Sequence, residues 1–331
     1  MPPISKRKRT MIIKQEATRG TFVTWPGSWA DTDFDLRFFN IQVSPEIEGY
    51  TEKFALGDHD MVAAVMGKQM CKVTASVLLR WSGAVDTSPN VRKALMACGL
   101  LETVNASTSV TWQPSKEADL GGGVSGSLDL PFDIMIQDEV MGSSPGAIGT
   151  MIRGALANGK LMCDQLGHPW RLDLEFTGVF DGCVDIANAN ILAPSGLETA
   201  QPDVFLSATM TMATVAQKVS KFELDFGNVV ELEEDPSDST GYLAAMITDR
   251  EPKLGIDPRV DLLANDPKYT RWSAGTETVL AIASSHFALD ADKCQLMTVA
   301  DAERSGMVAY DEAYNINRDD SNGYPWILTH S

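Results

Sequence analysis

The chain has 331 residues, 44% of them hydrophobic, which is enough to bury one large core or two ordinary ones. Its 27 basic and 45 acidic residues give a net charge of -18, which argues against a groove that binds duplex DNA through clustered Lys and Arg side chains. The five cysteines include no CxxC pair and the apolar runs are short, so we expect reduced thiols, no zinc site and no membrane insertion.

The chain begins with a basic segment, and we expect residues 1–20 to form an N-terminal arm. Because the rest of the chain is strongly acidic, the arm is expected to contact an acidic neighbouring subunit. The contacting residues would be the four consecutive basic ones, Lys6, Arg7, Lys8 and Arg9.

Three segments alternate apolar and polar residues with period two, which is typical of strands with one buried face. The clearest is 170–178, where Trp170, Leu172, Leu174 and Phe176 share one face. Segments 72–81 and 221–226 repeat the pattern, and shorter runs predict strands at 47–54, 109–112, 242–248 and 278–284. The chain is therefore predicted to be mainly β.

The connections between these strands are less regular. Segment 55–70 predicts a long loop, and 141–159, rich in Gly and Ser, predicts a mobile insertion. Ser88-Pro89 predicts the start of a short helix that ends at Gly99. Asp257-Pro258 predicts a second short helix.

Corresponding elements recur about 170 residues apart, as with the strands that begin at Lys72 and Tyr242. This spacing indicates an internal duplication. We predict a first unit at 21–190, a linker at 191–204 and a second unit at 205–331.

No active site is predicted. The Gly121–Gly126 run matches GxGxxG but precedes a strand instead of a helix, and Gly142–Gly146 matches GxSxG but places Pro145 where an oxyanion-hole N–H is needed. Asp58-His59-Asp60 lacks further ligands at a supporting spacing, so we expect no metal and no cofactor.

The order and spacing of several motifs resemble the major tail tube proteins of long-tailed, siphovirus-like bacteriophages. The matching segments run over most of the chain and include Glu16–Thr21, Val43–Pro45, Val91–Leu100, Leu172–Gly178, Ile247–Pro252, Ile256–Pro258 and Trp272–Thr276. Thr248-Asp249 departs from the Thr-Gly expected before Arg250, and 286–331 matches only loosely.

The resemblance implies two tandem β-barrel or sandwich units, each flanked by a short α-helix, in a structural virion protein that is not an enzyme. Three chains with pseudo-sixfold symmetry would form a ring, and stacked rings would form a tube. The tube would enclose the tape-measure protein, meet the tail terminator and distal tail proteins, and conduct DNA during ejection. Assembly in the bacterial host cytoplasm would place the protein in the virion tail.

The resemblance also implies two groups of functional residues. The first lies in the long loops that stack one ring on the next, at 55–70 and 227–241: Asp58, Met61, Val62, Val65, Met66, Glu231, Glu233 and Glu234. The second consists of acidic residues on polar strand faces, which would line the lumen and repel DNA phosphates: Asp129, Asp173, Glu175, Glu223 and Asp225.

Two alternatives remain open at the level of the sequence. One is a tail component that forms a single ring without polymerising, such as a terminator or connector. The other is an all-β carbohydrate-binding module whose tryptophans stack on sugars.

Overall fold

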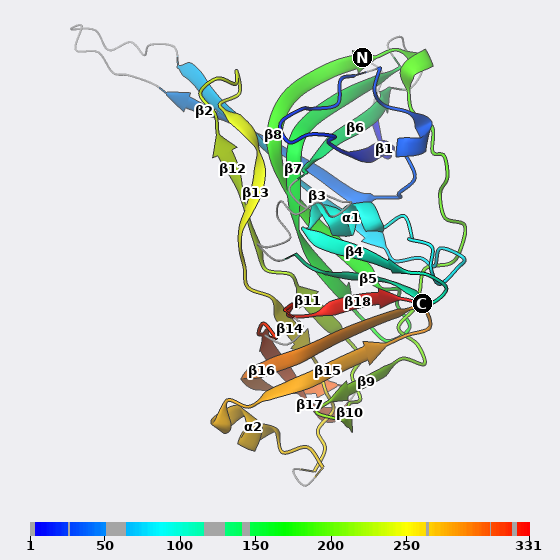
Figure 1. The fold of residues 1–331 in the computed structure, drawn as a ribbon, viewed down its shortest axis with the longest axis vertical. Helices are drawn as coiled ribbons and strands as arrows, with labels where there is room; N and C mark the ends of the chain where they lie inside the picture. The colour runs from blue at the N-terminus through cyan, green and yellow to red at the C-terminus, as the bar shows by residue number, and fades with distance from the viewer. Residues whose placement is uncertain are drawn as a thin grey trace, which may run out of the picture.

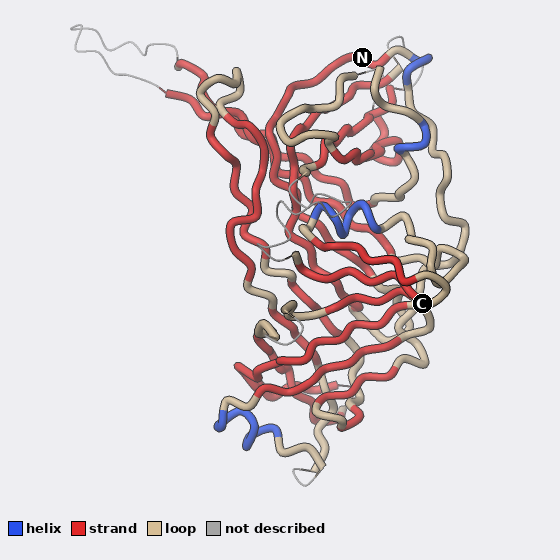
Figure 2. The backbone as a smooth tube through the Cα atoms, viewed as in Figure 1, coloured by secondary structure: helices blue, strands red, loops and turns tan. Residues whose placement is uncertain are grey.

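The computed structural model describes residues 4–25, 27–50, 64–115, 130–140, 146–262, 265–304, 306–319 and 323–331, with the backbone alone at 4–8 and 140. The described chain is mainly β, as predicted, with long strands crossing the whole molecule (Figures 1 and 2).

The first half of the chain contains eight strands, a helix and a short 3-10 turn. These elements are β1 (Ile4–Gln15), η1 (Asp31–Asp33), β2 (Phe39–Tyr50), β3 (Val65–Leu78), α1 (Arg92–Ala97), β4 (Leu100–Asn105), β5 (Ser109–Pro114), β6 (Phe132–Val140), β7 (Ala147–Cys163) and β8 (Arg171–Ile186).

The described part of the second half contains several short strands, the 18-residue strand β16 and a second helix. These elements are η3 (Asn188–Asn190), β9 (Thr209–Met212), β10 (Val215–Ala216), β11 (Phe222–Asp225), β12 (Asn228–Glu234), β13 (Tyr242–Arg250), β14 (Lys253–Ile256), α2 (Lys268–Ala274), β15 (Glu277–Ala283), β16 (Phe287–Arg304), β17 (Met307–Ile316) and β18 (Ile327–His330).

Both halves contribute to one 16-stranded sheet, in the order β10-β9-β15-β16-β17-β14-β11-β7-β8-β3-β2 along its main path. Strand β7 joins the halves, because its first part pairs with β6 and its last part with β11. A second junction is made by β18, which pairs with both β16 and β5. Because one sheet runs through both halves, it marks no boundary between two units. The division into two tandem units therefore stays a prediction.

The core follows from the alternation seen in the sequence. Trp170, Leu172, Leu174 and Phe176 are all buried, and Trp170 packs edge-on against Phe222 of β11 at 4.8 Å between ring centroids. The strands predicted at 170–178 and 221–226 are therefore confirmed. All five cysteines are free, and four of them are buried.

The prediction of a mobile insertion at 141–159 is wrong for its described part. Residues from Ala147 onward belong to β7, one of the most buried strands of the sheet. Its small residues allow close packing: a Cβ on Gly159 would lie 2.7 Å from the ring of Phe226, and one on Gly154 would lie 2.9 Å from the Cα of Ala244. The middle of β7, residues 151–157, is buried on both faces and carries no alternating pattern, and the small residues at buried positions concealed the alternation at its ends.

Of the two predicted helices, the first is present and the second is not. Helix α1 lies where Ser88-Pro89 predicted it, and Gly99 follows it with a left-handed φ of 69°, although Ser88 donates its hydroxyl to Glu102 at 2.9 Å instead of capping the helix. The helix predicted at Asp257-Pro258 is wrong, because α2 begins only at Lys268. Asp257 instead accepts backbone N–H groups from Ser220 and Lys221, both at 2.8 Å.

Candidate assembly surface

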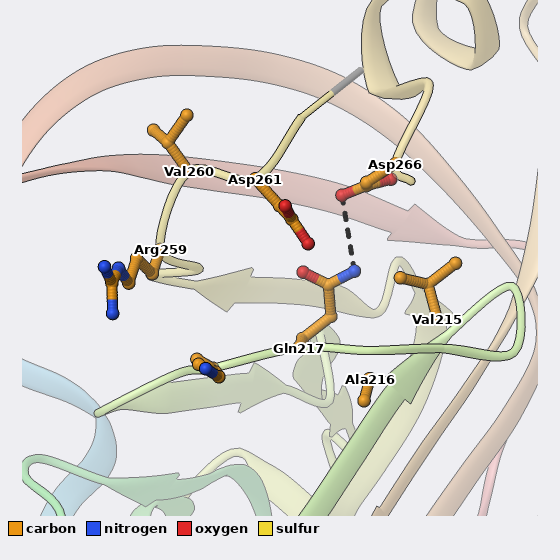
Figure 3. A pocket seen from close by; sticks show the side chains of 8 residues that line it. Val215, Ala216, Gln217, Arg259, Val260, Asp261 and Asp266 are labelled. Carbon is orange, nitrogen blue, oxygen red and sulfur yellow. Dashed lines mark hydrogen bonds between the residues drawn. The ribbon is translucent and has the colours of Figure 1, made fainter. Parts of the chain in front are cut away.

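We first searched the described residues for a catalytic or metal site. They contain no group of three or more His, Cys, Asp or Glu side chains that could hold a metal ion. One small cavity of about 190 Å³ lies beside β10 (Figure 3), where the amide of Gln217 donates to Asp266 at 3.3 Å. Asp266 is already paired with Lys268 and Arg271, so the acid in this cavity is held in a structural contact.

Two β-ribbons project from one corner of the molecule and form the most unusual surface of the structure (Figure 1). The first is made of β2 and β3, which pair from Phe39 opposite Ser76 to Tyr50 opposite Val65. Strand β2 is the last strand on the sheet path, and its other edge pairs with no described strand. We call this element the β2–β3 ribbon.

The end of the β2–β3 ribbon carries large apolar side chains in solvent. Ile47, Tyr50, Val65 and Met66 are 48%, 63%, 68% and 65% exposed. Tyr50 lies opposite Val65, whereas the Met66 sulfur lies 3.8 Å from where a Cβ on Gly49 would be, so each face of the ribbon end carries exposed apolar side chains, beside the exposed acids Glu46 and Glu48. A two-stranded ribbon with two apolar faces is marginal alone and needs a partner to bury it.

The second ribbon is made of β12 and β13, which form a separate two-stranded sheet. It lies beside the first, because Gln69 donates its backbone N–H to Thr240 at 3.1 Å and Lys68 forms an ion pair with Glu234. Its other side is held by Arg19, whose guanidinium lies 2.9 Å from Glu233.

The base of this second ribbon is fixed to the C-terminal end of α1. Arg250 donates to Asn228 at 2.7 Å and to the carbonyl of Gly99 at 3.2 Å, and Asn228 donates to the carbonyl of Cys98 at 2.8 Å. These donors satisfy carbonyls that a helix end leaves without intrahelical partners. Burial lowers the pKa of Arg250 to about 10. Asn228 carried no sequence signal, and Arg250 appeared only as part of a family-like motif.

The structure places the predicted stacking residues as follows. Val65 and Met66 lie at the end of the β2–β3 ribbon, within a strand and not in the loop predicted at 55–70. Segment 227–241, also predicted as a loop, is largely strand β12 followed by a turn. Glu233 and Glu234 pair with Arg19 and Lys68, Glu231 is exposed, and Asp58, Met61 and Val62 lie outside the described residues.

Four of the predicted lumen residues lie on one polar face of the sheet, and Asp129 lies outside the described residues. Lys160 of β7 pairs with Glu223 at 3.1 Å and with Asp225 at 3.2 Å. Asp173 pairs with Arg171 at 2.9 Å, and Glu175 is exposed. Burial would raise the pKa of Asp225, but hydrogen bonds, including one from Lys160, lower it below its ordinary value.

The predicted N-terminal arm is largely a strand of the sheet, since β1 pairs with β6. Arg9 donates two hydrogen bonds to Asp138 of its own chain, at 2.7 and 2.8 Å. The side chains of Lys6, Arg7 and Lys8 lie outside the description, so contact between these residues and another subunit stays a prediction.

No protein-family model and no curated protein matches the chain. Neither described helix has the length or apolar character needed to cross a membrane. The exposed apolar side chains at the end of the β2–β3 ribbon make this the candidate surface for protein association.

Proposed function

We propose that the protein is a structural subunit that polymerises as stacked rings into a phage-type tail tube. The observation that carries the proposal is the β2–β3 ribbon, which combines a twelve-residue strand at the sheet edge with apolar side chains on both faces. The motif order along the chain supports the same class of protein.

The physical argument rests on what such a ribbon does in solution. Unpaired strand edges template pairing with another chain, and natural proteins rarely leave them long and apolar. A contact between two different surfaces of the same subunit closes into a ring or repeats into a filament. Ring formation and stacking together would cover the ribbon, and we propose three chains per ring with pseudo-sixfold symmetry.

In this role the tube would enclose a tape-measure protein, join a terminator and distal tail proteins at its ends, and give DNA a passage without specific binding. The polar face that carries Asp173, Glu175, Glu223 and Asp225 is our candidate for the lumen lining. No cofactor and no catalysis are proposed.

The purified full-length protein tests this proposal by negative-stain electron microscopy. We expect long tubes of regularly stacked discs from the wild type and dispersed, folded subunits from a Val65→Asp, Met66→Asp variant. Both side chains are more than 60% exposed, so the substitutions should cost little folding stability. Val204→Asp, at a valine that is 38% exposed and forms only an isolated bridge with Pro169, is the control and should still form tubes.

Other outcomes of the same experiment distinguish the alternatives. Single rings that do not stack would indicate a terminator or connector. A monomer at high concentration would reject tube formation. A carbohydrate-binding module has less support, because Trp112, Trp170 and Trp326 are buried in the core.

A further inference from the structure

Two buried carboxyl groups touch each other where the N-terminal segment meets the sheet. Glu16 follows β1, Asp133 lies in β6, and their side chains share a hydrogen bond. The two residues are only 2% and 3% exposed. Two carboxylates cannot both carry charge at such a contact, so one proton must be shared between them.

The surrounding hydrogen bonds come from backbone N–H groups. Asp133 accepts one from Gly154 at 3.0 Å and another from Val23, and Glu16 accepts one from Gly20 at 2.8 Å. These neutral donors tie residues 16–23 to the two carboxyl groups. They cannot supply the full positive charge that a second carboxylate would require.

The charged neighbours do not neutralise the pair. No described cation lies within ion-pair distance of either carboxyl group. Arg19 on the same segment acts to lower the pKa of Glu16, but more weakly than burial and Asp133 raise it, and its guanidinium is engaged by Glu233. Arg153 on β7 is engaged by Asp238 and Asp181. Asp181, on β8, adds further negative potential and raises the pKa of Asp133 after the larger effect of burial. Burial and Asp133 together raise the pKa of Glu16 to about 8.

The segment held by this pair also clamps the β12–β13 ribbon. A Cβ on Gly20 would lie 2.6 Å from the side chain of Leu243, so the backbone presses directly on β13. Arg19 reaches Glu233 on β12, and the ring of Phe22 lies 4.9 Å from the guanidinium of Arg153. Release of residues 16–23 would remove these contacts together.

We propose that Glu16 and Asp133 form a proton-sensitive latch: one shared proton holds residues 16–23 against the sheet and the β12–β13 ribbon, and its loss to solvent at higher pH frees both. The same ribbon supports β3 through Lys68 and Gln69. The latch stands independently of the proposed function; only an effect on tube growth would rest on that proposal.

The latch predicts a specific pH dependence of local opening. A proton held in the closed state but released in the open state makes opening about tenfold easier per pH unit, until the pH passes the closed-state pKa. Opening should therefore rise from about pH 4.5, the ordinary pKa of a glutamate in the open state, to about pH 8 and level off above it.

Hydrogen–deuterium exchange on the full-length, unassembled protein measures this opening. Peptides covering residues 16–23 and 242–250 should lose protection as the pH rises, after correction for intrinsic exchange and normalisation to peptides from β16. In Glu16→Gln the amide still accepts from Gly20 and donates to Asp133, so the corrected pH dependence should disappear.

Glu198→Gln is the matched control, since burial raises the pKa of Glu198 to about 7 at a site that holds Asn90 instead. That variant should keep the wild-type behaviour at residues 16–23. Infrared difference spectra near neutral pH should also show a protonated carboxyl signal that Glu16→Gln removes. Identical corrected exchange in the wild type and Glu16→Gln, or an unchanged infrared signal, would overturn the latch, whether or not the protein forms tubes.

Discussion

The close packing of β7 predicts that adding a side chain at Gly159 will destabilise the fold. In Gly159→Ala the new Cβ would lie 2.7 and 2.8 Å from two carbons of the Phe226 ring and 2.9 Å from the sulfur of Cys98. Carbon atoms in contact normally lie about 3.5–4.0 Å apart, so the neighbours must move by most of an ångström. Phe226 has little room, because its ring packs on buried Trp326 at 4.7 Å between centroids.

Two opposing effects determine how much Gly159→Ala changes the free energy of unfolding. Overpacking a core typically costs about 1–3 kcal/mol. Replacing glycine by alanine reduces the conformational entropy of the unfolded chain, which stabilises the folded state by about 0.4–1 kcal/mol where the backbone conformation suits alanine. The strain should prevail, so we expect Gly159→Ala to lower the free energy of unfolding by about 1–2 kcal/mol.

Urea unfolding followed by tryptophan fluorescence measures the difference, with the wild type and the variant in the unassembled state. Gly255→Ala is the control, because the nearest atom to its Cβ is a carbonyl oxygen at 4.0 Å and the substitution should be neutral or slightly stabilising. A Phe226→Leu partner should recover part of the loss, with a coupling energy of about 0.5 kcal/mol or more. Equal stability of Gly159→Ala and Gly255→Ala would refute the packing argument.

Three further predictions concern buried polar groups. Arg250→Met should leave helix-end carbonyls unsatisfied, cost about 1–3 kcal/mol and increase hydrogen exchange in β12, whereas Arg250→Lys should recover only part. Lys268 is 1% exposed and lies 2.5 Å from Glu312, so Lys268→Met should leave a buried carboxylate without its partner and cost about 3–5 kcal/mol, measured by urea unfolding. Burial lowers the pKa of His330, so below about pH 6.5 the unfolded chain takes up the proton first and stability should fall. His330→Phe should flatten that dependence in thermal unfolding scans.

Strands with one buried face could be predicted from the sequence because their side chains alternate. Leu172 and Leu174 are buried where the pattern places them, and the charged residues between them face away from the core. The same rule fails for the middle of β7, where residues 151–157 are all buried, and for its ends, where small residues such as Gly149 and Gly159 take the buried positions. A continuously buried stretch gives no alternating signal, and glycine at a buried position does not read as apolar.

The errors in the second half have a different cause. Asp257-Pro258 carries a helix-start pattern, but its carboxylate is used by the backbone of Ser220 and Lys221, which a local rule cannot anticipate. The acidic run at 231–234 was predicted as part of a loop, although Glu231, Leu232 and Glu234 pair with β13 around a bulge at Glu233. Short-range signals could not reveal these partners, since the partners lie elsewhere in the chain.

In the candidate surface, too, some features could be expected from the sequence and others could not. The exposure of Val65 and Met66 was expected only from the family resemblance, which assigned them to a stacking loop, whereas the structure places them in strand β3. The latch could not be expected, since Glu16 and Asp133 are far apart in the sequence and each looks like an ordinary surface acid. Only the pairing of β1 with β6 brings them together.

The net charge of the chain does not by itself decide how strongly the proposed lumen repels DNA, because most of the acids on this face are paired. Of the four described acids on the polar face, Glu223 and Asp225 share Lys160, and Asp173 is paired with Arg171. Two opposite charges this close together produce little electric field at a distance, and physiological salt screens the remaining field over about 8 Å. Glu175 would then contribute most to the repulsion of phosphates near the wall, and exposed Lys72, which lies opposite Thr177 on the same face, would work against it. If this face lines a tube, low adhesion to DNA should depend more on keeping Lys160 and Arg171 paired than on the overall charge of -18.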